Sequence, residues 1–256
     1  MASGKASKRK RAQQAQVAAP RQGVDRRLVV AASVAAVLVA AVVVGVLTTR
    51  GAEPETAARG ATLPNATEST ALYEGIPQRG LTLGRDDAPV TLVEYVDMQC
   101  PYCREFEVDA LPALVDRHVR TGKLRVELRG LAFIGPDSDR GMRAVLAASR
   151  QNRLFEVKGL LFANQGHENT GWLTDELAEA AARSVPGTDV ARFTSDMGSG
   201  AVSALLQEHA REASRLGVDS TPTIFVGATG GDLRRVELAS PSDLGALERA
   251  IAAAAA

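Results

Sequence analysis

An α/β fold with a mixed sheet, preceded by one transmembrane helix, is the fold class that the sequence predicts. An apolar, β-branched run and a run that alternates apolar and charged residues flank a helical segment. A long helical block separates them from another apolar, β-branched run near residue 223. An uncharged run of twenty residues near the start of the chain predicts the membrane span. The order strand, helix, strand, helical block, hairpin and helix indicates a sheet with both parallel and antiparallel pairs.

The charges are distributed unevenly along the 256-residue chain, although it has 30 basic and 30 acidic residues. Residues 1–27 contain eight basic residues and one acidic residue, which leaves 22 basic and 29 acidic residues beyond them. A basic tail can bind nucleic acid or lie beside a membrane, and the segment that follows decides between the two. Because an apolar run follows directly, we expect a basic cytoplasmic tail at 1–27 and no nucleic-acid partner.

Residues 28–47 form the apolar run, in which Ser33 is the single polar side chain. Twenty residues at about 1.5 Å each span the roughly 30 Å hydrocarbon core of a bilayer. A soluble core helix of this length would show a polar stripe. A cleaved signal peptide is the stronger alternative, although its apolar region usually has about 7–15 residues. We predict an uncleaved anchor at 28–48, with the N-terminus in the cytoplasm and the residues beyond about 49 outside it.

Residues 49–75 are rich in Ala, Thr, Glu, Gly and Pro and have no apolar periodicity. This composition predicts a flexible linker. The folded domain is therefore expected over residues 76–256.

Apolar periodicity predicts the elements of that domain. Residues 90–96 are mostly apolar and β-branched, as in a buried strand, and residues 124–129 alternate apolar and charged side chains, as in a half-buried strand. A helix is expected from Cys-Pro-Tyr-Cys to about residue 119. The later elements are expected to be a helical block at about 138–216, strands at 223–226 and 235–238, and a helix at 241–256.

The two cysteines of the chain, Cys100 and Cys103, lie three positions apart. A structural disulfide stabilises a protein by closing a long loop, and this pair would close almost none. A zinc site needs about four ligands, and the three histidines of the chain have no ligand-like spacing. We therefore interpret the pair as a redox centre, and we predict neither a metal nor a bound cofactor.

Pro101 fits the first turn of a helix, where its missing N–H has no cost. Cys100 would then lie at the helix N-terminus, where free N–H groups and the helix dipole stabilise a thiolate and lower its pKa. A stabilised thiolate makes the disulfide easier to reduce, and therefore more oxidising.

Glu94 lies six residues before Cys100, within an otherwise apolar strand. Alternation places it on the same face as Leu92 and Val96. A solvated face is one interpretation. The other is a buried face, where desolvation would raise the pKa of Glu94 and the carboxyl group could exchange a proton with Cys103.

Residues 220–227, Ser-Thr-Pro-Thr-Ile-Phe-Val-Gly, place Pro222 at the start of a strand. Together these features resemble the thioredoxin fold, and specifically the DsbA-like family of bacterial extracytoplasmic disulfide oxidoreductases. That family has Cys-x-x-Cys at a helix start after a buried strand, often an acidic residue six positions upstream, and a cis-proline opening a late strand. The long interval between Cys103 and Pro222 resembles the helical domain that DsbA-like proteins insert, here at about 138–216.

The resemblance covers residues 76–256 and implies a mechanism. A substrate thiolate attacks Cys100, Cys103 leaves, and a second substrate thiol resolves the mixed disulfide. The loop at cis-Pro222 would present backbone groups of Thr221 to an extended substrate. Pro101 and Tyr102 would also face the substrate. The implied partners are exported cysteine-containing proteins and, for recycling, a membrane quinone-linked thiol oxidase.

Two residues differ from the best-known DsbA proteins. Tyr102 stands where those have histidine, and Thr221 stands where they have valine. Our main hypothesis is an oxidase that introduces disulfides into exported proteins. A reductase or isomerase of the same fold is the enzymatic alternative, and a non-enzymatic anchored binding or assembly protein is the alternative of another class.

Overall fold

The centre of the fold is strand β3 (Val90–Asp97), in which all eight residues are buried. The computed structural model describes residues 62–256, which form one six-stranded sheet in the order β1-β2-β4-β3-β5-β6. β3 pairs in parallel with β4 (Leu124–Leu131) and antiparallel with β5 (Thr223–Ala228). The other strands are β1 (Gln78–Arg79), β2 (Thr82–Leu83) and β6 (Arg234–Arg235).

β3 is buried on both faces because both faces of the sheet are covered. Leu92 and Val96 belong to the large hydrophobic core, whereas Val93 and Tyr95 belong to a smaller cluster with Phe225 on the other face. In β4, by contrast, buried and half-buried residues alternate, as the sequence predicted. The predicted mixed sheet is therefore present, with β3 at its middle.

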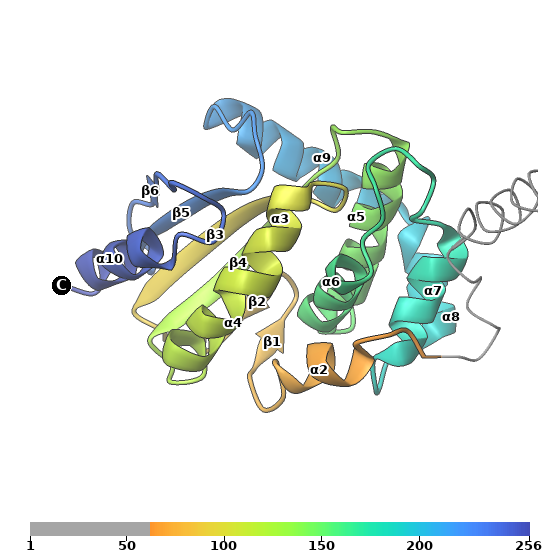
Figure 1. Cartoon of the computed structure of the whole chain (residues 1–256), viewed down its shortest axis with the longest axis horizontal. Coiled ribbons are helices and arrows are strands. Elements are labelled where there is room, and N and C mark those ends of the chain that lie inside the picture. The colour runs from red at the N-terminus through yellow and green to blue at the C-terminus, as the bar shows by residue number, and fades with distance from the viewer. Residues whose placement is uncertain (1–61) are drawn as a thin grey trace, which may run out of the picture. The chain divides into compact units, whose positions relative to one another are not determined.

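The helix that follows the cysteines is one continuous segment with two π-helical turns. Pro112 has no N–H to donate within such a helix, and a π-turn lies just before it. Figure 1 shows this segment lying across the sheet. Its parts are α3 (Pro101–Glu105), η1 (Phe106–Ala110), α4 (Leu111–Leu114) and η2 (Val115–Val119).

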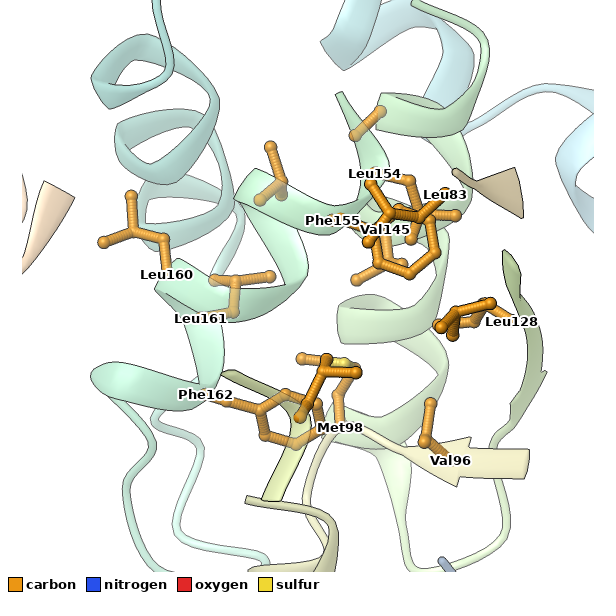
Figure 2. Close-up of a cluster of buried hydrophobic side chains, with 14 of the residues drawn as sticks. Leu83, Val96, Met98, Leu128, Val145, Leu154, Phe155, Leu160, Leu161 and Phe162 are labelled. Atoms are coloured by element: carbon orange, nitrogen blue, oxygen red, sulfur yellow. The ribbon is translucent and has the colours of Figure 1, made fainter. Parts of the chain in front are cut away.

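The predicted helical insertion is present between β4 and β5 and consists of five helices, grouped largely beside the sheet (Figure 1). It shares one core with the sheet. Figure 2 shows Phe155 and Phe162 of α6 in one cluster with Val96 of β3 and Leu128 of β4. The five helices are α5 (Pro136–Ser149), α6 (Leu154–Ala163), α7 (Asp175–Ser184), α8 (Val190–Met197) and α9 (Gly200–Arg215).

The end of the chain differs slightly from the prediction. The last strand, β6, covers residues 234–235, whereas the sequence predicted 235–238. Beyond it, Val236 N still donates to Ile224 O of β5 at 2.8 Å. The closing helix α10 (Leu244–Ala254) begins after the cap Asp243, whose side chain accepts a hydrogen bond from Ala246 N. Leu247 and Ile251 of α10 bury into the large core.

The segment before β1 is folded, contrary to the predicted linker. Helix α2 covers Ala66–Ala71, and Leu63 and Tyr73 on either side of it are 7% and 2% exposed. Leu63 N also donates to Ser184 Oγ at 2.8 Å. Two isolated apolar side chains in a polar segment produce no periodicity, which is why the pattern did not reveal them.

The predicted tail at 1–27, the anchor at 28–48 and residues 49–61 of the linker lie outside the described residues. Within residues 62–256, no helix has both the length and the apolar character needed to cross a bilayer.

Candidate active site

Cys100 is the N-cap residue of α3, and Pro101 occupies the first turn, as the sequence predicted. The chain arrives from β3, and the extended backbone of Cys100 turns it into the helix. Cys100 is 5% exposed and Cys103, one turn further, is 1% exposed. Both are free thiols, so the structure shows the reduced form.

The loop before β5 contacts Cys100. Cys100 Sγ donates a hydrogen bond to the carbonyl oxygen of Thr221 at 3.2 Å, and the peptide bond between Thr221 and Pro222 is cis. Because β5 pairs with β3, with Thr223 opposite Tyr95, the start of β5 lies beside the end of β3 that leads into Cys100. Cys100 and Thr221, which lie 121 positions apart in the sequence, are thus in contact through the Cys100 sulfur.

The two thiols have opposite pKa shifts. The pKa of Cys100 is lowered to about 6, chiefly by the hydrogen bond from the Cys103 thiol, with further contributions from the side chain of Thr221 and from backbone groups at the helix start. Burial raises the pKa of Cys103 well above its ordinary value. At neutral pH the pair therefore carries one thiolate, at Cys100, and one thiol, at Cys103.

The two residues between the cysteines form the outer rim of the site. Pro101 and Tyr102 are both exposed, and 60% of the Tyr102 surface is accessible. A large aromatic side chain in this position offers an apolar contact beside the Cys100 sulfur.

Glu94 belongs to a second, fully buried group of charges. Its carboxylate forms an ion pair with Lys158 of α6, which also pairs with Glu107 Oε2 of η1 at 2.9 Å. Tyr73 donates from its hydroxyl to Glu107 Oε1 at 2.9 Å. We call these four residues the buried charge cluster.

Burial raises the pKa of Glu94, and the charge of Glu107 adds to this effect, although Lys158 opposes it. For Lys158, burial lowers the pKa, but the two carboxylates outweigh burial and raise it. Glu94 is therefore buried, as one of the two interpretations of the sequence required. It contacts a lysine from the helical insertion.

The sequence prediction missed Glu107, Lys158 and Tyr73. A signal for Lys158 was available, because it lies within the otherwise apolar run Val-Lys-Gly-Leu-Leu-Phe at 157–162. A lysine in such a run is a candidate partner for a buried acid. Tyr73 had no such signal, since it lies in a segment that reads as a linker.

The loop between α6 and α7 holds the turn that carries Cys100. Gln165 Nε2 donates to the carbonyl oxygens of Met98 at 3.0 Å and Cys100 at 3.2 Å. Asn169 N donates to Gln99 Oε1 at 2.6 Å, and Gln99 is fully buried. These side chains satisfy the polar groups of a turn that has no sheet partner.

One cavity of the described residues lies away from the two cysteines. A cavity of about 620 Å³ lies between α2 and the start of α6, and neither cysteine nor Thr221 lines it. Among residues 62–256, no group of three or more His, Cys, Asp or Glu side chains is arranged to hold a metal ion.

A thioredoxin-type fold with two unequal thiols at the start of its first long helix defines a thiol–disulfide oxidoreductase. The thioredoxin family model matches residues 78–238. The "Probable disulfide bond formation protein D" of Bacillus anthracis is 31% identical over 173 residues, which cover 66% of this chain and 76% of that protein.

Solved structures with lower sequence identity share the fold. BdbD from Bacillus subtilis, in its oxidised form, gives a TM-score of 0.61 at 20% identity, covering 70% of this chain and 97% of that one. Wolbachia pipientis alpha-DsbA1 gives a TM-score of 0.57 at 16% identity, covering 71% and 92%. The chain belongs to the thioredoxin family and is a DsbA-like protein disulfide oxidoreductase, which confirms the family and the enzyme class predicted from the sequence.

Proposed function

We propose that the protein introduces disulfide bonds into exported proteins, with Cys100 and Cys103 as its redox pair. The observation that carries this direction is the low pKa of Cys100, about 6. A stabilised thiolate favours the reduced form of the enzyme, and so favours transfer of the disulfide to a substrate. The name of the Bacillus relative, a disulfide bond formation protein, supports the same direction.

The reaction transfers two electrons from the substrate to the enzyme. A substrate thiolate attacks Cys100 Sγ of the oxidised enzyme, the bond between Cys100 and Cys103 breaks, and Cys103 leaves as a thiolate that takes up a proton. A second substrate thiolate then attacks the substrate sulfur of the mixed disulfide and releases the Cys100 thiolate. The substrate is oxidised to a disulfide and the enzyme is reduced to a dithiol.

Four further residues have proposed roles in this reaction. The backbone of Thr221, held by cis-Pro222 beside Cys100, pairs with an extended substrate segment. Pro101 and Tyr102 contact the substrate from the exposed rim.

Glu94 supplies the proton that Cys103 takes up. Burial raises the pKa of both groups, so the Cys103 thiolate binds a proton readily and the Glu94 carboxyl group takes one up more easily than an exposed carboxyl group would. Glu94 lies on the face of β3 that contributes to the large core, and Cys103 belongs to that same core.

We place the enzyme outside the cytoplasm, with residues 28–48 as its anchor, residues 1–27 on the cytoplasmic side, and 76–256 as the catalytic domain extended by the folded segment from 62. The basic tail followed by an uncharged apolar run supports this arrangement, and an oxidising compartment suits the chemistry. A membrane quinone-linked thiol oxidase restores the disulfide. We expect the full chain to resist extraction from membranes by carbonate. We also expect residues 62–256 to be cleaved by protease added outside the cell.

The test of direction uses the purified, oxidised full chain and a reduced peptide with two cysteines. We expect the peptide to become oxidised in stoichiometric amount, and Cys103→Ala to trap mixed disulfides with exported proteins in cells. If the protein instead stays reduced in cells and reduces insulin efficiently, the reductase alternative replaces this proposal.

A further inference from the structure

Asp97, the last residue of β3, is fully buried, and its side chain accepts three hydrogen bonds from backbone N–H groups. Its Oδ1 accepts from Gln99 N at 2.9 Å. Its Oδ2 accepts from Phe133 N at 3.0 Å and from Ile134 N at 3.3 Å. One side chain thus ties the turn that leads to Cys100 to the loop that follows β4.

The bond from Gln99 N fixes the turn at residues 97–100, which we call the redox turn; the helix from α3 to η2 that follows it is the redox helix. An aspartate side chain that accepts from the N–H two residues later forms an Asx-turn, which restricts the backbone between them. Asp97 also accepts through its backbone, because Cys100 N donates to Asp97 O at 3.1 Å. The side chain and the backbone of Asp97 therefore both close the redox turn.

The bonds from Phe133 N and Ile134 N connect the redox turn to the loop after β4. β3 and β4 pair in parallel as far as Asp97 and Leu131, so the two chains leave the sheet side by side. Beyond this point the buried Oδ2 of Asp97 satisfies two N–H groups of the loop. Because a buried polar group without a partner is costly, the side chain and the loop hold each other in place.

The backbone of Asp97 also interacts with Cys103. Burial raises the pKa of the Cys103 thiol, and Cys100 adds to this effect. Hydrogen bonds from the backbone of Asp97 and from the side chain of Thr221 act in the opposite direction. A thiolate only accepts hydrogen bonds, so the backbone group concerned is the N–H of Asp97. β5 offers this N–H no competing acceptor, because its pairing with β3 ends opposite Tyr95.

We propose that Asp97 is a positioning residue for the redox pair: the hydrogen bonds of its side chain to the redox turn and to the loop after β4 hold its own backbone N–H beside Cys103. When a thiolate attacks Cys100 and the disulfide breaks, the electron pair of that bond goes to the Cys103 sulfur. The N–H of Asp97 stabilises this thiolate until it takes up a proton. This role rests on the proposed function of Cys100 and Cys103 as the redox pair, although not on the direction of the reaction.

The test follows the release of thionitrobenzoate when the reduced full chain reacts with an equimolar amount of dithiobis(nitrobenzoate). In the first step, the Cys100 thiolate releases one thionitrobenzoate and forms a mixed disulfide with the other. In the second step, the Cys103 thiolate attacks Cys100 Sγ and releases the remaining thionitrobenzoate. The rate constant of the second step, measured from about pH 5 to 9, reports how readily the Cys103 thiolate forms.

In Asp97→Asn, an amide nitrogen replaces one of the two acceptor oxygens, so either Gln99 N or the loop after β4 loses its bond. The N–H of Asp97 is then held less firmly beside Cys103. Losing a hydrogen bond to the charged sulfur lowers the thiolate fraction of Cys103 about tenfold. The more basic thiolate is also more nucleophilic, so we expect the second step to slow about threefold at each pH and the first step to change less.

Asp243→Asn is the matched control. Asp243 also accepts backbone hydrogen bonds at both side-chain oxygens, from Ala246 N at 3.0 Å and from Ala239 N at 3.2 Å, and it caps α10. Both steps should keep their wild-type rates in this variant. If Asp97→Asn does not fold, NMR of the full wild-type chain with isotope-labelled aspartate provides the measurement. The amide proton of Asp97 should shift as Cys103 ionises at alkaline pH, and should not do so in Cys103→Ala.

The outcomes separate the role of Asp97 from the proposed function. A second step that is unchanged or faster in Asp97→Asn would overturn the role of Asp97; a faster one would show that the charge of the side chain, and not its hydrogen bonds, governs Cys103. A first step slowed as much as the second, or an equal slowing in Asp243→Asn, would indicate a general loosening and overturn the role too. If the wild type shows no second release, Cys100 and Cys103 are not a redox pair, and the proposed function is wrong as well.

Discussion

At the scale of single residues, the reactivity of the site depends on the difference between two neighbouring thiols. Cys100 lies at a helix start with the Cys103 thiol as donor, whereas Cys103 is enclosed by the core. Tyr102 between them is exposed and adds no charge. The asymmetry therefore arises from burial and hydrogen bonds, and not from a charged side chain between the cysteines.

A pH titration of alkylation measures this asymmetry directly. In the reduced wild type, the iodoacetamide reaction of Cys100 should have a midpoint at about pH 6. In Cys103→Ala the midpoint should rise toward the unperturbed value of about 8.5, because the largest cause of the shift is removed. A midpoint that stays near that of the wild type would show that the helix start alone stabilises the thiolate.

The same shift affects the stability of the reduced protein. The pKa of Cys100 is lower in the folded state than in the unfolded state. The stabilisation that the Cys100 thiolate provides is therefore fully present above the pKa of the unfolded state. It is lost as the pH falls through about 6. In urea denaturation, the free energy of unfolding of the reduced wild type should therefore rise relative to that of reduced Cys100→Ser as the pH rises from about 6 to 9.

At the scale of elements, the loop between α6 and α7 connects the helical insertion to the redox turn. Gln165 donates to two carbonyl oxygens of that turn, at Met98 and Cys100. The insertion thus supports the backbone from which the thiolate receives its N–H groups, in addition to supplying Lys158 to the buried charge cluster.

Gln165→Ala should destabilise the protein by about 1–2 kcal/mol, because two buried carbonyl groups lose their donor. It should also slow alkylation of Cys100 at neutral pH, since a looser helix start stabilises the thiolate less. Gln151→Ala is the matched control, since Gln151 also makes two hydrogen bonds, both to the backbone of Asp189 and far along the chain from the cysteines. A loss of stability without any change in alkylation would limit Gln165 to a structural role.

At the scale of the whole molecule, the segment from residue 62 to β1 packs into the described fold. It buries Leu63, Tyr73 and Ile76, and it contacts both the helical insertion and the segment that follows the redox helix. The family model matches residues 78–238, so this segment precedes the residues that the model covers.

Two truncations test this conclusion. A protein that begins at residue 62 should unfold in urea at nearly the same concentration as the full chain. In a protein that begins at residue 78, the free energy of unfolding should fall by on the order of 5 kcal/mol, because three buried apolar side chains are removed. Equal stability of the two truncated proteins would contradict an integral role for residues 62–77.

Some features of this protein followed from the sequence by itself. The mixed sheet, the helical insertion and the enzyme class could be predicted, because their signals are local: β-branched runs, helical periodicity, and two cysteines three positions apart. The position of Pro101 in the first helical turn also depends only on its neighbours.

The tertiary structure alone decided which distant residues meet. Thr221 reaches Cys100 across 121 positions, and Lys158 reaches Glu94 across 64. Such contacts have no periodic signal, because each depends on how the elements pack and not on the pattern within one of them. For the same reason Tyr73, in a segment that reads as a linker, became part of the buried charge cluster only when the fold brought it to Glu107.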